Sequence, residues 1–243
     1  MLSERPWRLD VALWFCAAQL VSLCLGVTLA GLLHNSGVAG FQAPDGPGAV
    51  LVSSLAFQGV GWGLIWIFLR LHRVRWRDAL GMHGPQLRRA WLPVLLVTGV
   101  ILPLAWLLQA ASAQALTRLG WHPENEIAVT VVTNARTWWL RAYLGVFTVV
   151  IAPVTEEFIF RGLLYPLVKQ LGWPRLAWFG VSLLFALIHG DAAAFAPLFA
   201  LALALTWLYE FTDTLLAPIS VHALFNAVNL AALYLLQHQH DLS

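Results

Sequence analysis

Seven apolar stretches, most of them long enough to cross a lipid bilayer, constrain the fold of this 243-residue chain more than any other feature. They cover residues 11–33, 49–69, 91–116, 140–168, 175–190, 192–210 and 214–236. About 20 apolar residues in a helix cross the hydrocarbon core of a membrane. Backbone groups in lipid have no water to bind, so each stretch must satisfy its own hydrogen bonds as a helix. The sequence therefore predicts an all-α, polytopic transmembrane helical bundle with about seven spans.

Charged residues make up only 11% of the chain, and this scarcity excludes an ordinary soluble domain. Such domains carry roughly a quarter charged residues. The first stretch is longer than the apolar core of a signal peptide, so we interpret it as a retained helix. The fifth stretch is short, and only Gly190 and Asp191 separate it from the sixth. The boundary between these two spans is the least distinct in the sequence.

Arginine residues between the second and third stretches predict the orientation of the chain. They are Arg70, Arg73, Arg75, Arg77, Arg88 and Arg89, whereas residues 34–48 contain no Lys or Arg. Basic loops stay on the cytoplasmic side, so we expect the N-terminus there and an integral membrane protein. The short chain favours the inner (plasma) membrane of a bacterium. The arginines can also contact anionic membrane lipid, and nothing in their pattern suggests nucleic acid as a partner.

Three charged side chains lie inside the fourth apolar stretch, at Glu156, Glu157 and Arg161. A charge at membrane depth is energetically expensive and marks a functional site. Glu157 and Arg161 are four residues apart, so they share a helix face and can pair. Glu156 points about 100° away from Glu157 and can face a different cavity. Pro153 removes a backbone hydrogen bond just before them and favours a kink. We interpret the pair as structural support and Glu156 as functional.

Further polar side chains lie in the later stretches, at His189, His222 and Asn226. Taken alone, His189 is typical of a satisfied core histidine, and the other two are typical of a pair that joins two helices. We therefore compared depths, counting 1.5 Å per residue from the charged end of each span. Glu156, His189 and Asn226 are all roughly 20 Å deep, and His222 is roughly 14 Å deep. This agreement predicts that the four side chains form one buried site.

The chemistry of such a site favours hydrolysis. A carboxylate can act as general base on water, and a nearby histidine can share the proton. A second histidine and an asparagine amide can donate hydrogen bonds to a developing oxyanion. No Ser or Cys in these motifs stands as a nucleophile, so water is the expected attacker. The same Glu and His side chains can also bind a divalent metal such as zinc, although the His-Glu-x-x-His run of many metalloproteases is absent.

Three motifs resemble those of the CPBP intramembrane proteases, the family of the type II CAAX prenyl endopeptidases. They are Glu156-Glu157-x-x-x-Arg161, Phe185-x-x-x-His189 and His222-x-x-x-Asn226, and the resemblance covers roughly residues 140–232. The resemblance implies that Glu156 and His189 activate water, while His222 and Asn226 stabilise the oxyanion. It also implies that Glu157 and Arg161 support the site. The family is often described as metalloproteases, but these motifs favour a glutamate-activated water, so no cofactor is favoured.

The sequence therefore predicts an intramembrane endopeptidase acting on a membrane-associated peptide or protein, prenylated or not. We expect N-terminal helices and a basic loop in residues 1–135, a catalytic core in 136–236 and a tail in 237–243. Two alternatives stay open at this stage. Intramembrane Glu, His and Arg also serve proton- or ion-coupled transporters, although those commonly show internal repeats that this chain lacks. A catalytically silent membrane scaffold could also keep such pairs for packing.

Overall fold

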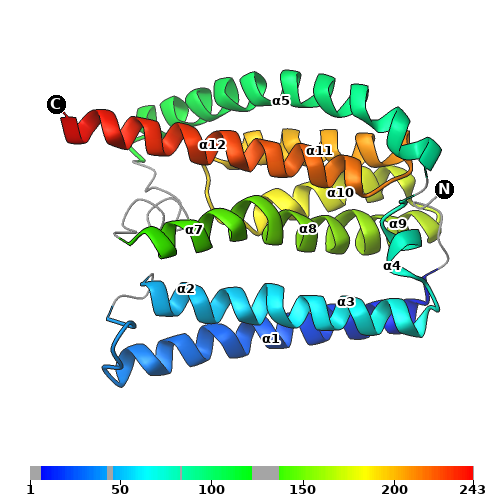
Figure 1. The fold of residues 1–243 in the computed structure, drawn as a ribbon, viewed down its shortest axis with the longest axis horizontal. Helices are drawn as coiled ribbons and strands as arrows, with labels where there is room; N and C mark the ends of the chain where they lie inside the picture. Colours follow the sequence, from blue (N-terminus) through cyan, green and yellow to red (C-terminus); the bar gives the residue numbers. More distant parts are fainter. Residues whose placement is uncertain (1–6, 43–45, 83, 122–136, 243) are drawn as a thin grey trace. The chain divides into compact units, whose positions relative to one another are not determined.

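The computed structural model describes residues 7–42, 46–82, 84–121 and 137–242, and all regular structure in these ranges is helical (Figure 1). The described residues fall into two compact units. One contains residues 76–82, 84–121 and 145–242, and the other contains residues 7–42, 46–75 and 137–144. The all-α prediction is confirmed. Glu156, Glu157, Arg161, His189, His222 and Asn226 all belong to the first unit.

The smaller unit is built on two apolar helical rods. The first is α1 (Leu9–Asn35), and the second runs through α2 (Pro47–Ser54), a π-helical segment η2 (Leu55–Gly59) and α3 (Val60–Leu71). Polar side chains of α1 join the rods at the π-helical segment. Gln19 Nε2 donates to the Phe57 carbonyl at 2.9 Å, and Ser22 Oγ donates to the Ala56 carbonyl at 2.7 Å. In lipid, the hydrophobic effect does not drive helices together, so hydrogen bonds between helices contribute to their association.

A close backbone approach at Gly26 also joins the two rods. A Cβ built on Gly26 would lie 2.4 Å from the Cβ of Ala56, which is shorter than any ordinary contact. Overpacking of this kind destabilises a protein by about 1–3 kcal/mol. We therefore expect Gly26→Ala to lower the free energy of unfolding by that amount, measured by thermal unfolding in detergent. Gly31→Ala is the matched control in the same helix, because a Cβ there has no neighbour within 4 Å. Equal melting temperatures for the two variants would contradict this account.

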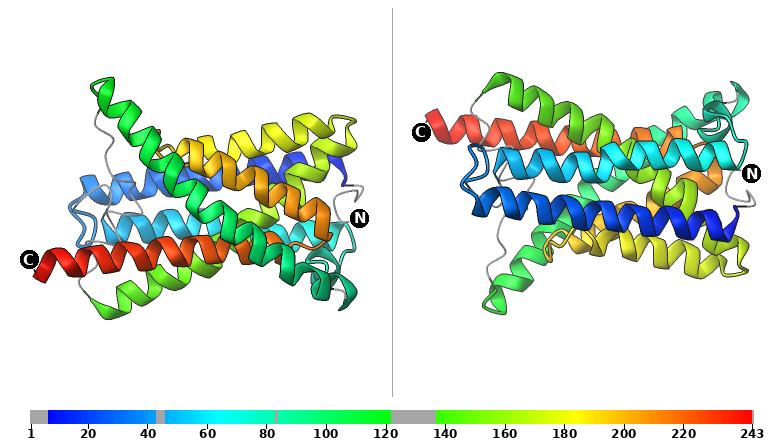
Figure 2. Two further views of the ribbon diagram at one scale, coloured as in Figure 1. Left: turned by 90° about the horizontal axis from the view of Figure 1, so that it is seen from above. Right: turned by 90° about the horizontal axis from the view of Figure 1, so that it is seen from below.

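The larger unit contains the remaining helices. They are α4 (Trp76–Ala79), α5 (Gly84–Arg118), α8 (Ala152–Glu157), η4 (Phe158–Leu164), α9 (Tyr165–Gln170), α10 (Pro174–Leu187), α11 (Phe195–Thr212) and α12 (Leu216–Leu242). The helix α7 (Trp138–Val146) and the π-helical segment η3 (Phe147–Ile151) lead into α8. In the left view of Figure 2, α5 crosses obliquely over α11 and α12. Their shared core contains Ala90, Val94, Ile101, Ala105, Leu201, Leu205, Leu208, Ala217, Val221 and Phe225.

Six helical runs in the described part of the chain are long and apolar enough to cross a membrane. They match the predicted spans except the fifth, which forms the shorter helix α10 of 14 residues. A helix of that length rises only about 21 Å, less than the ~30 Å hydrocarbon core. The last span is longer than expected, because α12 continues through the predicted tail to Leu242. Residues 122–136, between the third and fourth predicted spans, lie outside the described residues.

Candidate active site

Glu156 and Glu157 end a short α-helical piece between two π-helical segments. The piece is α8, with η3 before it and η4 after it. Pro153 lies in the first turn of α8, where its missing N–H interrupts the hydrogen-bond ladder. π-Helical turns inside α-helices are rare and occur often at functional sites. The kink expected at Pro153 is thus accompanied by a local change of helix type on both sides of the two carboxylates.

Glu157 and Arg161 form the ion pair that their spacing predicts. Arg161 Nη1 lies 2.9 Å from Glu157 Oε1, and both side chains are fully buried. The guanidinium also donates from Nη2 to the Ala202 carbonyl at 3.0 Å and from Nε to Thr206 Oγ1 at 3.4 Å. Its carbon lies 4.8 Å from the centre of the Phe185 ring, a cation–π distance. Arg161 therefore reaches acceptors on two helices and an aromatic face on a third.

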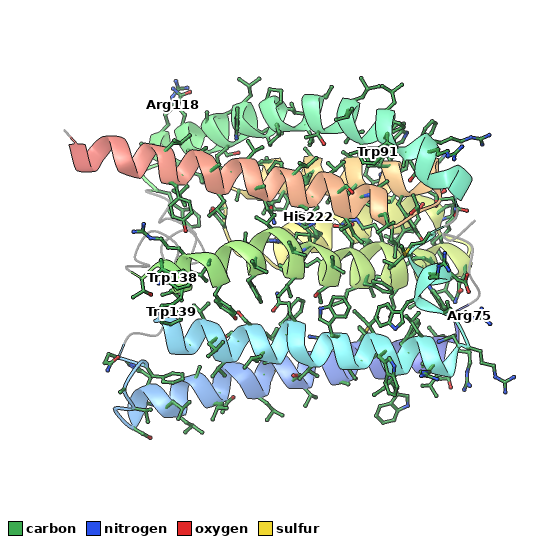
Figure 3. All side chains as sticks on the ribbon, in the orientation of Figure 1. Arg75, Trp91, Arg118, Trp138, Trp139 and His222 are labelled. Atoms are coloured by element: carbon green, nitrogen blue, oxygen red, sulfur yellow. The ribbon has the colours of Figure 1, made fainter. Side chains whose placement is uncertain are left out.

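His222 contacts both carboxylates, one through each ring nitrogen. Its Nδ1 lies 2.8 Å from Glu157 Oε1, and its Nε2 lies 3.8 Å from Glu156 Oε2. Glu157 accepts from Arg161 through the same oxygen, so it acts as an ionised acceptor and Nδ1 carries the proton. The side chains of His222 and Glu156 are only 4% and 14% exposed. Figure 3 shows His222 on the side of α12 that faces α8.

Glu156 makes no direct hydrogen bond within the part of the chain that the structure describes. Its distance of 3.8 Å from His222 Nε2 is too long for a direct bond. Polar groups at such a separation are commonly bridged by water. The carboxylate and the imidazole nitrogen are therefore close enough for one water molecule beside them to hydrogen-bond to both. Glu156 thus differs from Glu157, which is paired with Arg161.

His189 is linked to His222 by the aromatic ring of Phe185, which contacts both histidines. Its Nδ1 donates to the Phe185 carbonyl at 2.7 Å, which leaves Nε2 with a free lone pair. The Phe185 ring lies 4.8 Å from the His189 ring and 5.7 Å from the His222 ring, measured between centroids. Phe185 thus contacts both histidines, and its side chain is fully buried. His189 itself is half-buried.

Asn226 lies one turn beyond His222 on α12. Its Nδ2 donates to the Thr148 carbonyl in η3 at 2.9 Å. This bond holds α12 against the π-helical segment that precedes the two carboxylates. The amide keeps a second N–H and its carbonyl oxygen without a hydrogen bond in the described structure. Asn226 can therefore position η3 and still donate one hydrogen bond.

The structure joins Glu156, Glu157, Arg161 and His222 by direct distances, and it links His189 to them through Phe185. Sequence reasoning missed the acceptors of Arg161 on α11 and the Thr148 carbonyl. A threonine inside the apolar 192–210 stretch was the one visible signal for Thr206. The carbonyl acceptors carry no side-chain signal at all, so only the tertiary structure identifies them.

Several donors of the site are already engaged in hydrogen bonds. Among the described residues, no three His, Cys, Asp or Glu side chains gather closely enough to hold one. Glu157 Oε1 already accepts from Arg161 and His222, and His222 Nδ1 is occupied by the same contact. Zinc needs at least three free protein ligands in a catalytic site. The donors that stay free in the described structure are Glu156 and the Nε2 atoms of His222 and His189.

Part of the chain matches a known protein family. A family model described as "Type II CAAX prenyl endopeptidase Rce1-like" matches residues 137–228. The matched segment begins at the start of α7 and ends within α12, so it contains all six residues of the candidate site. Searches of curated proteins and of solved structures found no significant match.

Proposed function

Because residues 137–228 carry an Rce1-like type II CAAX prenyl endopeptidase domain, we propose that this integral membrane protein is an intramembrane endopeptidase. It hydrolyses a peptide bond of a membrane-associated peptide or protein, prenylated or not. The observation that carries the proposal is the 3.8 Å separation of Glu156 Oε2 and His222 Nε2, two polar atoms that face each other in an apolar bundle. At this separation, one water molecule lying beside the two atoms can hydrogen-bond to both, and hydrolysis consumes such a water molecule.

Glu156 is the general base in this proposal. Its carboxylate takes a proton from water while the water oxygen attacks the carbonyl carbon of the substrate. The carbonyl oxygen becomes an oxyanion in the tetrahedral intermediate. Collapse of that intermediate breaks the C–N bond, and the proton passes to the leaving nitrogen. His189, with its free Nε2, shares the proton between Glu156 and the leaving group.

His222 and Asn226 supply hydrogen bonds to the oxyanion. His222 Nδ1–H is already donated to Glu157, so Nε2 donates to the oxyanion only in a ring that has taken up a second proton from solvent before the attack. Glu157 Oε1 accepts from Nδ1 and is itself paired with Arg161, which holds the ring in place. The second N–H of the Asn226 amide provides the other donor. Preorganised donors of this kind act most strongly in a site that excludes bulk water.

The membrane setting follows from the same residues. We propose that the substrate enters from the lipid phase, since the site lies on helices that can cross a membrane. The arginine-rich loop and the N-terminus lie on the cytoplasmic side, and the arginines contact anionic lipid. A bacterial inner membrane is the proposed location. No resident cofactor takes part in the reaction.

Cleavage of defined peptides tests the proposed function. We expect the purified protein to cleave members of a panel of fluorogenic peptides, prenylated and unprenylated, and to keep its rate in a strong chelator. His189→Ala should reduce kcat by about a hundredfold, because removing a proton-sharing group costs 10²–10⁴ in rate. Loss of cleavage in chelator with recovery on adding zinc would contradict the glutamate mechanism. Full activity of His189→Ala would contradict the assignment of that residue.

A further inference from the structure

The helix α11 supplies two further acceptors for the Arg161 guanidinium, in addition to Glu157. Arg161 Nη2 donates to the Ala202 carbonyl at 3.0 Å, and Arg161 Nε donates to Thr206 Oγ1 at 3.4 Å. Ala202 and Thr206 lie one turn apart and are almost completely buried, at 0% and 1% exposure. Three of the guanidinium's five N–H groups are thus directed by Glu157, Ala202 and Thr206.

The hydroxyl of Thr206 has a fixed polarity in this arrangement. Its hydrogen is donated to the Ala202 carbonyl at 2.9 Å, so its oxygen is left as an acceptor. That acceptor faces Arg161 Nε, which can only donate. An apolar residue of the same shape would leave the Nε–H of a buried arginine without this partner. Unsatisfied donors in a buried site are strongly unfavourable, so the guanidinium would shift or turn.

A shift of Arg161 would move Glu157, and the movement of Glu157 would change its hydrogen bond with His222 in the proposed catalytic centre. Arg161 Nη1 and His222 Nδ1 both bind Glu157 Oε1, at 2.9 and 2.8 Å. The position of this oxygen decides which nitrogen of His222 carries the proton and which one faces Glu156. A single hydroxyl on α11 therefore lies at the far end of a chain of hydrogen bonds that ends at His222.

We propose that Thr206 is a positioning residue that fixes the Nδ1–H tautomer of His222 through Arg161 and Glu157. The catalytic consequence rests on the proposed function, whereas the tautomer itself does not. Back-bonding of a threonine to a carbonyl four residues earlier is common in apolar helices and by itself indicates only packing. The contact with Arg161 distinguishes a positioning role from a packing role, because packing does not require the Thr206 oxygen to accept a hydrogen bond.

Three variants test the proposal. Thr206→Val keeps the shape of the side chain and removes the acceptor, whereas Thr206→Ser keeps the acceptor. Thr212→Val is the matched control, because the buried hydroxyl of Thr212 donates to the Leu208 carbonyl at 2.7 Å and lies near the Thr214 carbonyl, away from Arg161. Each protein is labelled with ¹⁵N-histidine, and the His222 signal is assigned by its loss in His222→Gln.

The expected result is a change of tautomer in one variant alone. At a pH where the ring is neutral, we expect protonated Nδ1 in the wild type, in Thr206→Ser and in Thr212→Val, and a mixture of tautomers in Thr206→Val. Where a peptide is cleaved, kcat of Thr206→Val should fall about tenfold with KM unchanged, as for one lost hydrogen bond to a charged group. A tautomer unchanged in Thr206→Val, or changed equally in Thr206→Ser, would overturn the proposal. The expected tautomers in a protein that cleaves no peptide would instead count against the proposed function.

Discussion

Glu156→Gln is expected to reduce peptide cleavage by about a thousandfold, the largest effect of any single substitution in this chain. Loss of a general base typically lowers the rate by 10²–10⁴. The amide keeps the shape of the carboxylate but cannot take a proton from water. Glu156 makes no direct hydrogen bond in the described structure, so the exchange breaks none. Rates of cleavage in detergent, measured for single turnovers and at steady state, check the prediction.

The control for this substitution is a carboxylate outside the site. Asp10→Asn neutralises an exposed acid on α1 whose partner is Arg8, and it should leave cleavage unchanged. The melting temperature of Glu156→Gln should equal that of the wild type, which separates lost chemistry from lost folding. Cleavage that survives Glu156→Gln within tenfold would exclude Glu156 as the base and, with it, the proposed reaction.

The helices of this protein follow from its apolar stretches because lipid leaves the backbone no alternative. The first rod illustrates this, since the predicted 11–33 stretch is observed as Leu9–Asn35. The three π-helical segments could not be predicted in the same way. Apolar side chains suit an α-helical and a π-helical turn about equally, so the difference depends on tertiary contacts. The Gln19 bond to the Phe57 carbonyl is one such contact, and it joins residues far apart in sequence.

Within the site, the spacing of residues in the sequence predicted contacts only between residues of the same helix. The pair Glu157–Arg161 follows from a separation of four residues, because those positions share a helix face. The contact of His222 with Glu157 joins residues on different helices, and no local pattern encodes it. Counting residues by depth predicted a common layer for the polar groups, but it could not predict which atoms meet. The sequence associated His222 with Asn226 by spacing, whereas the structure joins each of them to the helical run that contains Glu156.

Arg161→Met is expected to destabilise the fold by about 3–5 kcal/mol, the largest effect on stability that the structure predicts. The side chains of Arg161 and Glu157 are both fully excluded from solvent, at 0% exposure. The substitution therefore leaves an ionised carboxylate without its main partner. One oxygen of that carboxylate, Glu157 Oε2, already lacks a hydrogen-bond partner in the described structure. Uncompensated charge in an apolar bundle is highly unfavourable. Thermal and denaturant unfolding in detergent measure the loss.

The double substitution Glu157→Gln with Arg161→Met distinguishes a lost ion pair from lost packing volume. Removing both charges together avoids the uncompensated carboxylate, and replacing a buried pair by neutral groups is often close to neutral in stability. An amide oxygen at position 157 can still accept from His222 Nδ1. We therefore expect the double variant to recover most of the stability that Arg161→Met loses. A double variant as unstable as the single one would show that Arg161 acts through its bonds to Ala202 and Thr206 and its contact with Phe185, and not through the charge of Glu157.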